Sequence, residues 1–149
     1  MPTDDVKIKL EGIEEMTRNL EKLGTRVALR GPAAAVRAAG AVIIKEMRRR
    51  APRDTGSLKK SLGQRVKTYR RSGVVTSIIG ARSKRYETEK GRRNPAYYAH
   101  LLELGRKGVS ARPFMRPAWD SSASAARQAA IDKMQQIFEK EAASVGSGS

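Results

Sequence analysis

The stretch Arg50-Ala51-Pro52-Arg53-Asp54-Thr55-Gly56-Ser57-Leu58 decides how the chain is folded. Pro52 lacks a backbone N–H and biases the residue before it away from the α region, so a helix that reaches Arg50 has to end here. Asp54 and Thr55 have side chains that can cap a helix, and Gly56 tolerates backbone angles that other residues avoid. The stretch therefore predicts a corner where a long helix ends and a second unit begins near Ser57.

Before this corner the sequence predicts one strand and two helices. Val6 to Leu10 alternates apolar and charged residues, as a half-buried strand does. From Ile13 to Leu23 apolar residues recur at helical spacing, and Gly24 should end this amphipathic helix. Pro32 is well placed at the start of the next helix, which runs from Ala33 to Arg50, buried at its start and basic at its end.

After the corner, Ser57 to Leu62 could form one more helical turn. Gln64 to Tyr69 and Val74 to Ile79 are predicted strands, and the four residues between them include the glycine of a hairpin turn. Residues 81–94 are predicted to be a long polar loop, because they contain few apolar residues. Pro95 to Gly105 is typical of a short helix or a strand.

The last predicted helix runs from about Ala118 to Ala142, after an irregular segment that contains Pro113 and Pro117. The expected fold class is α+β, with a small, mostly antiparallel sheet. This sheet should pack against the long central helix, with the amphipathic helix before it and the last helix after it. We expect a single domain over residues 1–143 and a flexible tail over residues 144–149.

Positive charge is concentrated in the middle of the chain. The formal net charge is +16, and residues 45–93 contain 17 Lys and Arg against four Asp and Glu, which leaves +13 in this block. Like charges repel, so such a block should face an anionic partner. Nucleic acid is the first candidate, an acidic partner protein the second, and a solvated surface the third.

Composition excludes several classes of site. The chain has no cysteine, so it has no disulfide, thiolate metal site or cysteine nucleophile. No apolar run is expected to approach the roughly 18–20 residues of a membrane span, and the N-terminus does not have the pattern of a signal peptide.

Two patterns suggest chemistry, but neither predicts a catalytic, metal or cofactor site. Asp54 to Ser57 matches the catalytic tetrapeptide of aspartic proteases, yet arginines precede it where such an aspartate needs a buried apolar strand and a second aspartate. His100 is the only histidine, which is too few for a usual zinc site, and no nucleophile is spaced to use it as a base. We therefore expect no catalytic residue, metal or cofactor.

Three motifs in order give the sequence a resemblance. They are Ala51 to Leu58 with Ser61-Leu62 after it, then Tyr97 to Gly105, then Arg112 to Ala118. Together with the long helix before the first, they resemble the tail-completion, or neck, proteins of long-tailed bacteriophages, which join head and tail. That family shows AP-x-x-TG-x-L-x-x-S, then Y-A-x-x-x-E-x-G, then PF-x-x-PA before a C-terminal helix.

The resemblance implies a non-enzymatic α+β virion protein that forms a ring, commonly of six copies, between the head connector and the tail tube. Genomic DNA would pass through the bore, and assembly would take place in the host cytoplasm, without a membrane. The structural motif residues that the resemblance carries over are Pro52, Thr55, Gly56, Leu58, Tyr98, Glu103, Gly105, Pro113, Phe114 and Pro117. Candidate contacts to DNA or to an acidic partner are Arg65, Lys67, Arg70, Arg71, Arg82, Lys84, Arg85, Lys90, Arg92 and Arg93.

Two other functions stay open on the sequence. A tail terminator, which caps the tail tube, has the same architecture. A free basic protein that binds DNA without sequence preference would use the same charge, although the sequence shows no DNA-reading element.

Overall fold

The computed structural model describes residues 13–53, 56–83, 86–88 and 91–147. Its elements in chain order are α1 (Ile13–Arg50), α2 (Ser57–Ser61), β1 (Leu62–Tyr69), β2 (Val74–Ala81), β3 (Tyr86–Thr88), β4 (Gly91–Arg93), α3 (Pro95–Leu104) and α4 (Met115–Gly146). The fold is mixed α+β and mostly helical, which confirms the predicted class.

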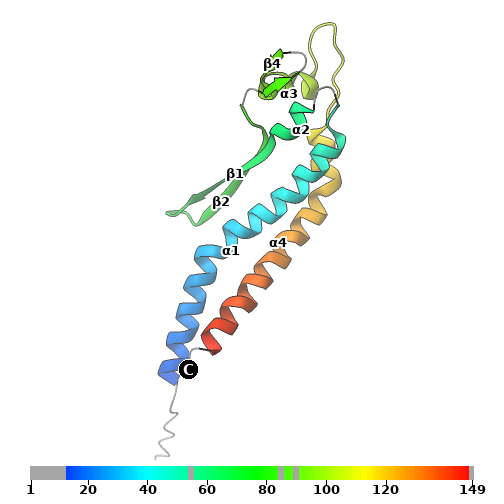
Figure 1. Ribbon diagram of the computed structural model, residues 1–149. Helices are drawn as coiled ribbons and strands as arrows, with labels where there is room; N and C mark the ends of the chain where they lie inside the picture. Colours follow the sequence, from blue (N-terminus) through cyan, green and yellow to red (C-terminus); the bar gives the residue numbers. More distant parts are fainter. Residues whose placement is uncertain (1–12, 54–55, 84–85, 89–90, 148–149) are drawn as a thin grey trace, which may run out of the picture.

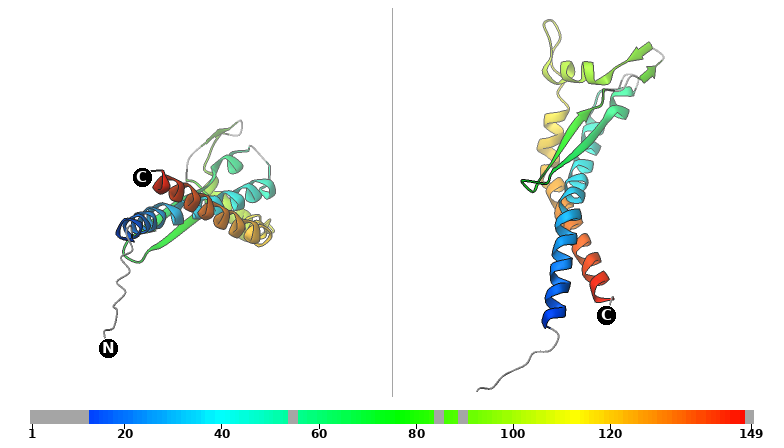
Figure 2. Two further views of the ribbon diagram at one scale, coloured as in Figure 1. Left: turned by 90° about the horizontal axis from the view of Figure 1, so that it is seen from below. Right: turned by 90° about the vertical axis from the view of Figure 1, so that its left-hand side faces the viewer.

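Helices α1 and α4 run antiparallel and cross, and α2, α3, β3 and β4 gather at the end of α1 where the chain turns, whereas the β1–β2 hairpin runs back from that end toward the level of the middle of α1 (Figures 1 and 2). The buried faces of this pair carry small and medium apolar residues. From α1 these include Ala35, Ile43 and Met47, and from α4 they include Ala118 and Ala126. Small residues on both faces let the two helices approach closely, because little side-chain volume separates the backbones.

Helix α1 is one continuous helix, so the predicted break between Gly24 and Pro32 is wrong. Pro32 lies inside the helix. Figure 1 shows the axis of α1 bending where its colour changes from blue to cyan, as expected where a proline removes a backbone hydrogen bond. Contacts with α4 favour a continuous α1 between Gly24 and Pro32, because Glu141 on α4 forms ion pairs with Arg26 and Arg30, at 3.7 and 3.4 Å.

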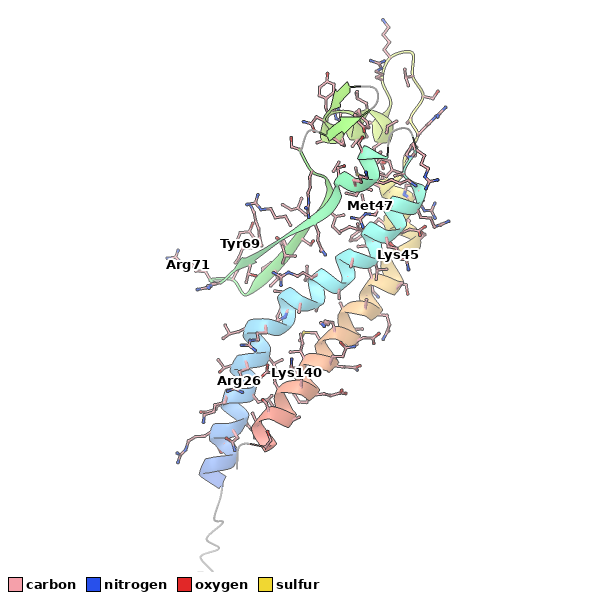
Figure 3. The ribbon with its side chains drawn as sticks, in the orientation of Figure 1. Arg26, Lys45, Met47, Tyr69, Arg71 and Lys140 are labelled. Atoms are coloured by element: carbon pink, nitrogen blue, oxygen red, sulfur yellow. The ribbon has the colours of Figure 1, made fainter. Side chains whose placement is uncertain are left out.

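Strands β1 and β2 form the predicted antiparallel hairpin, with Leu62 opposite Ala81 and Tyr69 opposite Val74. Gly73, in the turn, has a φ of 67°. The base of the hairpin is fixed to α1, because the Arg48 guanidinium donates a hydrogen bond to the Leu62 carbonyl oxygen at 2.9 Å. The far end projects from the helix pair (Figure 3).

The hydrophobic core lies where the hairpin, α1, α3 and α4 meet. Phe114 and Leu62 are each 1% exposed, and Ala118 is fully buried. Ile44 and Ala99 join them in the same cluster. The core therefore sits at one end of the helix pair, beside the corner at Pro52.

Several predicted elements need correction. Residues 81–94 are not a plain loop, because β3 and β4 pair within them. For the second motif the prediction left helix or strand open, and the structure shows a helix, with the Asn94 side chain capping α3 by accepting a hydrogen bond from the Ala96 N–H. Helix α4 continues to Gly146, beyond the predicted end at Ala142, since its last turns pack against α1. The predicted strand Val6 to Leu10 lies outside the described residues.

By length and composition, the part of α1 from Thr17 to Arg50 is apolar enough to cross a membrane. This corrects the expectation that no segment approaches the length of a membrane span. The same helix supplies Ile43, Ile44 and Met47 to the core, and a core helix has the same composition.

Candidate functional site

The three sequence motifs meet at one junction beside the corner. The first and second are linked by a hydrogen bond of 2.9 Å between the hydroxyl groups of Ser57 and Tyr98. The second and third are linked by the Glu103 carboxylate, which accepts hydrogen bonds from backbone N–H groups at the start of α4. Motifs that are far apart in sequence thus form one structural unit.

The corner has the geometry that its sequence predicts. Helix α1 ends at Arg50, and Pro52 follows it. Gly56 is the N-cap of α2 and has a φ of 76°, in the left-handed region that favours glycine. Leu58 is 4% exposed and belongs to the core. Thr55, the remaining predicted residue of this motif, lies outside the described residues.

Glu103 links α3 to the start of α4. Its carboxylate accepts from the N–H groups of Phe114, Met115 and Arg116, at 2.8, 2.9 and 3.0 Å. Partial burial raises the pKa of the Glu103 carboxyl group, but these hydrogen bonds outweigh that effect and hold its pKa below the usual range. The negative charge also lies at the positive end of the α4 dipole.

The other motif residues fix the path between α3 and α4. Gly105 ends α3 with a φ of 75°, and a Cβ atom there would lie 2.9 Å from the Ala111 nitrogen. The Phe114 side chain is buried in the core, whereas Pro113 is exposed. Pro117 lies in the first turn of α4, where its missing N–H costs no helical hydrogen bond.

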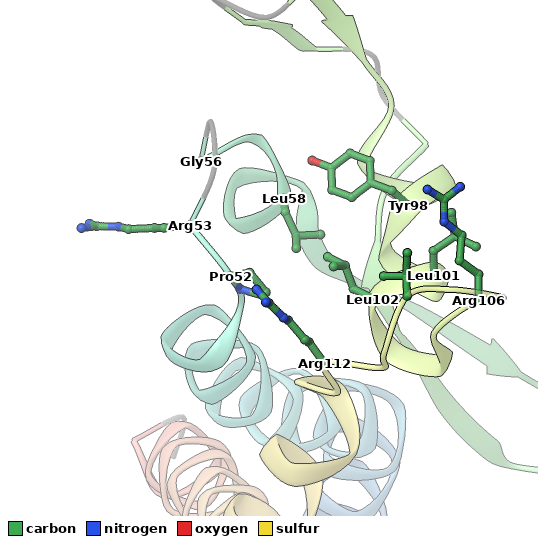
Figure 4. Close-up of a pocket in the computed structure, with 10 residues that line it drawn as sticks. Pro52, Arg53, Gly56, Leu58, Tyr98, Leu101, Leu102, Arg106 and Arg112 are labelled. Atoms are coloured by element: carbon green, nitrogen blue, oxygen red, sulfur yellow. The ribbon is translucent and has the colours of Figure 1, made fainter.

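A pocket of about 450 Å³ opens at this junction. Its apolar lining includes Pro52 from the corner, Leu58 from α2, and Leu101 and Leu102 from α3. Figure 4 shows Leu58, Leu101 and Leu102 pointing toward one another. The pocket is a feature that sequence analysis missed, because its residues come from separate segments.

The predicted basic contacts divide into two groups. Arg65 and Lys67 lie on the face of the hairpin that is directed away from α1, and Arg70 and Arg71 lie in its turn; all four are exposed. Figure 3 shows Arg71 at the far end of the hairpin, next to Tyr69. Of the others, Arg82 is exposed after β2, Arg92 and Arg93 lie on β4, and Lys84, Arg85 and Lys90 lie outside the described residues.

Comparison with known families identifies the chain. Residues 14–105 match the model of the HK97-gp10-like family, described as "Bacteriophage HK97-gp10, putative tail-component". The chain belongs to this family. No curated protein and no solved structure matches it.

The match places this HK97-gp10-like protein among phage tail components, which agrees with the resemblance to tail-completion proteins. The matched residues run from the start of α1 to Gly105, so they include the corner, the hairpin and Glu103. They end before Phe114 and α4. The capping contacts of Glu103 therefore join the family-matched region to the remainder of the chain.

In the basic block of this HK97-gp10-like protein, Glu46 forms hydrogen bonds with two arginines of the same helix. The Glu46 carboxylate accepts hydrogen bonds from Arg49 at 2.6 Å and Arg50 at 2.7 Å. Hydrogen bonds from Arg49 and then Arg50 lower the pKa of Glu46 to about 2. Part of the positive charge at the end of α1 is thus neutralised within the subunit.

Of the two chemical patterns in the sequence, the structure fully describes only His100. His100 is exposed, and its ring lies edge-on to Tyr97 with 6.1 Å between the ring centroids. Among the described residues, no group of His, Asp and Glu side chains could hold a metal ion. Asp54, of the protease-like tetrapeptide, lies outside the described residues.

Proposed function

We propose that this HK97-gp10-like protein completes the tail as a neck protein. Six copies would form a ring that joins the tail to the head connector, with the genome passing through the bore. The protein would have a structural role without catalysis, and it would be assembled in the host cytoplasm. The observation that carries the proposal is the projecting basic hairpin of β1 and β2, on a chain whose family is a phage tail component.

The hairpin has features of a surface that another subunit covers. Its outward face exposes Tyr69, Val74 and Ile78, with exposed fractions of 51, 48 and 60%. Within the described part of the chain, β1 and β2 pair only with each other, so each strand has one free edge. Exposed apolar side chains next to unpaired strand edges favour association, which supports a closed ring of copies.

The charge of the hairpin supports a role near DNA. Residues 62–81 contain four Arg and Lys and no Asp or Glu. Basic side chains on a projecting element attract phosphate groups without reading base sequence. Such contacts suit a channel through which every part of a genome has to pass.

Deletion of the gene from a phage tests the proposal. We expect heads filled with DNA and separate tails of normal length, visible by electron microscopy. The wild-type gene supplied in trans should restore joined particles. If joined, infectious virions form without this protein, the proposed function is wrong.

The same experiment separates the two other candidate functions. Tails of uncontrolled length would assign the protein to the tail terminator role, which the family description also fits. Normal particles with a defect in DNA replication would instead favour a free DNA-binding protein.

A further inference from the structure

The junction pocket has an apolar interior. Leu58, Leu101 and Leu102 converge in it, and Pro52 and Val109 complete the apolar lining (Figure 4). The apolar surface continues outside the pocket, since Val109 is 49% exposed and Leu104, one turn after Leu101 on α3, is 66% exposed. An exposed apolar hollow of this size is a typical anchor site for a side chain of another protein.

Among the residues that the structure describes, the charged residues that line the pocket all have the same sign. They are Arg53, Arg106 and Arg112. Within the described part of the chain, none of these arginines forms an ion pair. Figure 4 shows Arg53 directed away from the pocket and Arg112 reaching across toward Pro52. Arg106 and Arg112 are therefore the two cations that an occupant would meet.

We propose that this pocket docks an acidic peptide segment of a neighbouring virion protein. An apolar side chain of the segment inserts between Leu58, Leu101 and Leu102. Its flanking carboxylates bind Arg106 and Arg112, because the planar guanidinium group can donate two parallel hydrogen bonds to one carboxylate.

The apolar lining of the pocket favours a peptide over DNA as its occupant. The phosphate backbone has no apolar group that would fill a hollow lined by leucines. The projecting hairpin offers DNA a larger group of exposed cations, four in all and without an Asp or Glu among them. The inference deepens the proposed function and rests on it, since a neck protein has to hold a neighbour in the particle as well as face the genome.

Binding of labelled peptides to the purified full chain tests the proposal by fluorescence anisotropy. The probe is a short peptide in which leucines alternate with glutamates. One comparison peptide has lysine in place of glutamate, and another has serine in place of leucine. We expect the acidic leucine peptide to bind at least about tenfold more tightly than either comparison peptide.

Two charge-reversal variants separate the pocket from the hairpin. The double variant Arg106→Glu and Arg112→Glu should weaken binding of the acidic leucine peptide at least about tenfold, and it should weaken duplex DNA binding less than the same charge change in the hairpin turn does. The matched variant Arg70→Glu and Arg71→Glu, which makes the same charge change in the hairpin turn, should keep peptide binding. Circular dichroism confirms that each variant is folded. The proposal is overturned if the wild-type chain does not bind the peptide or if both variants lose binding equally.

A crosslinking experiment in assembled particles identifies the occupant. A photoreactive amino acid in place of Leu101 should crosslink to an acidic segment of another virion protein, and the variant Arg106→Glu with Arg112→Glu should abolish this crosslink. Crosslinking only to another copy of this chain, or only to DNA, would contradict the proposal. Either result leaves the neck function untouched, because that function is tested by particle assembly.

Discussion

Glu103 replaces the capping residue that α4 lacks at its own start. Phe114 occupies the N-cap position of α4, and its side chain cannot accept a hydrogen bond. The Glu103 carboxylate, from α3, instead accepts from the first three N–H groups. The acidic residue of the second motif and the start of the third are therefore parts of one contact.

We expect Glu103→Gln to lower the free energy of unfolding by about 1–2 kcal/mol at pH 7, because a neutral amide is a weaker acceptor and loses the dipole interaction. The folded-state pKa of Glu103 is lowered, so its stabilising effect is present above the unfolded carboxyl pKa of about 4.3. This effect is lost as the pH falls through the folded pKa. Urea unfolding between pH 7 and pH 3 should show the two proteins converging in stability.

Glu139→Gln is the matched control. Glu139 is exposed on α4. This variant should change stability by less than about 0.5 kcal/mol at either pH. An equal loss in both variants, or a loss in Glu103→Gln that does not depend on pH, would contradict the capping role.

Glycine is required at the corner for backbone geometry alone. A Cβ atom on Gly56 would meet no atom of the described residues beyond its chain neighbours within 4 Å, but its φ of 76° is unfavourable for other residues. We expect Gly56→Val to cost about 1–2 kcal/mol of stability. Gly105→Ala should cost more, because its Cβ would also press on the backbone of Val109 and Ala111. Thermal unfolding measures both.

The control for the corner is Gly24→Val, which makes the same change in open space at a helical position. It should alter stability by less than about 0.5 kcal/mol. If Gly56→Val is no worse than Gly24→Val, the backbone at the corner is less constrained than its φ indicates.

At the scale of elements, Gln64 adds a second polar contact between the hairpin and α1, beside that of Arg48. The Gln64 amide donates a hydrogen bond to the Arg37 carbonyl oxygen at 2.9 Å and accepts one from the Ser77 hydroxyl at 3.0 Å. A Cβ atom on Gly40 would overlap this amide, so glycine allows the strand to approach the helix.

We therefore expect Gly40→Val to displace Gln64 and loosen the hairpin while α1 and α4 stay folded. Hydrogen exchange should become faster at the β1 and β2 amides and stay unchanged at the buried amides of the helices. Gly24→Val, on the same helix, should leave exchange in the hairpin unchanged. Protection of the hairpin that is equal in all three proteins would show that Gln64 does not hold it.

Local signals predicted most elements, but they failed where tertiary contacts decide the outcome. The hairpin was predictable because its strands alternate and a glycine turn separates them. The break at Gly24 to Pro32 was wrong, because packing on α4 and the ion pairs of Glu141 favour a continuous helix. The composition of α4 did not show which side is buried, since Trp119 is 56% exposed whereas Ala118 and Ala126 are buried.

Sequence patterns also identified the residues of the junction without showing how they connect. Glu103, Gly105 and Phe114 belonged to motifs, but their contacts join separate segments and have no local signature. The pocket was unpredictable for the same reason, since the corner, α2, α3 and the turn after α3 all contribute to it.

At the scale of the whole molecule, acidic and basic side chains differ in what they contact. Glu46, Glu103 and Glu141 are all used within the subunit, while Arg70 and Arg71 project from it. The subunit can therefore present its net charge of +16 mostly through exposed Lys and Arg. Long-range attraction of an anionic partner should depend strongly on salt.

Duplex DNA binding should fall steeply as salt rises, without sequence preference. If Arg70 and Arg71 each contact a phosphate, the variant Arg70→Glu with Arg71→Glu should reduce the slope of log affinity against log salt by roughly 2. Filter binding at several salt concentrations measures the slope. An unchanged slope would show that the hairpin turn does not contact DNA.

The pairing of α1 with α4 also fixes the order in which the molecule can be completed. Its two partners are separated by all the other described elements, so the contact closes only after α4 has left the ribosome. Until then the apolar face of α1, with Ala35, Ile43 and Met47, has no partner from α4. A nascent chain that stops before Met115 can complete neither the core nor the cap at Glu103, and so we expect only subunits that include α4 to be competent for assembly.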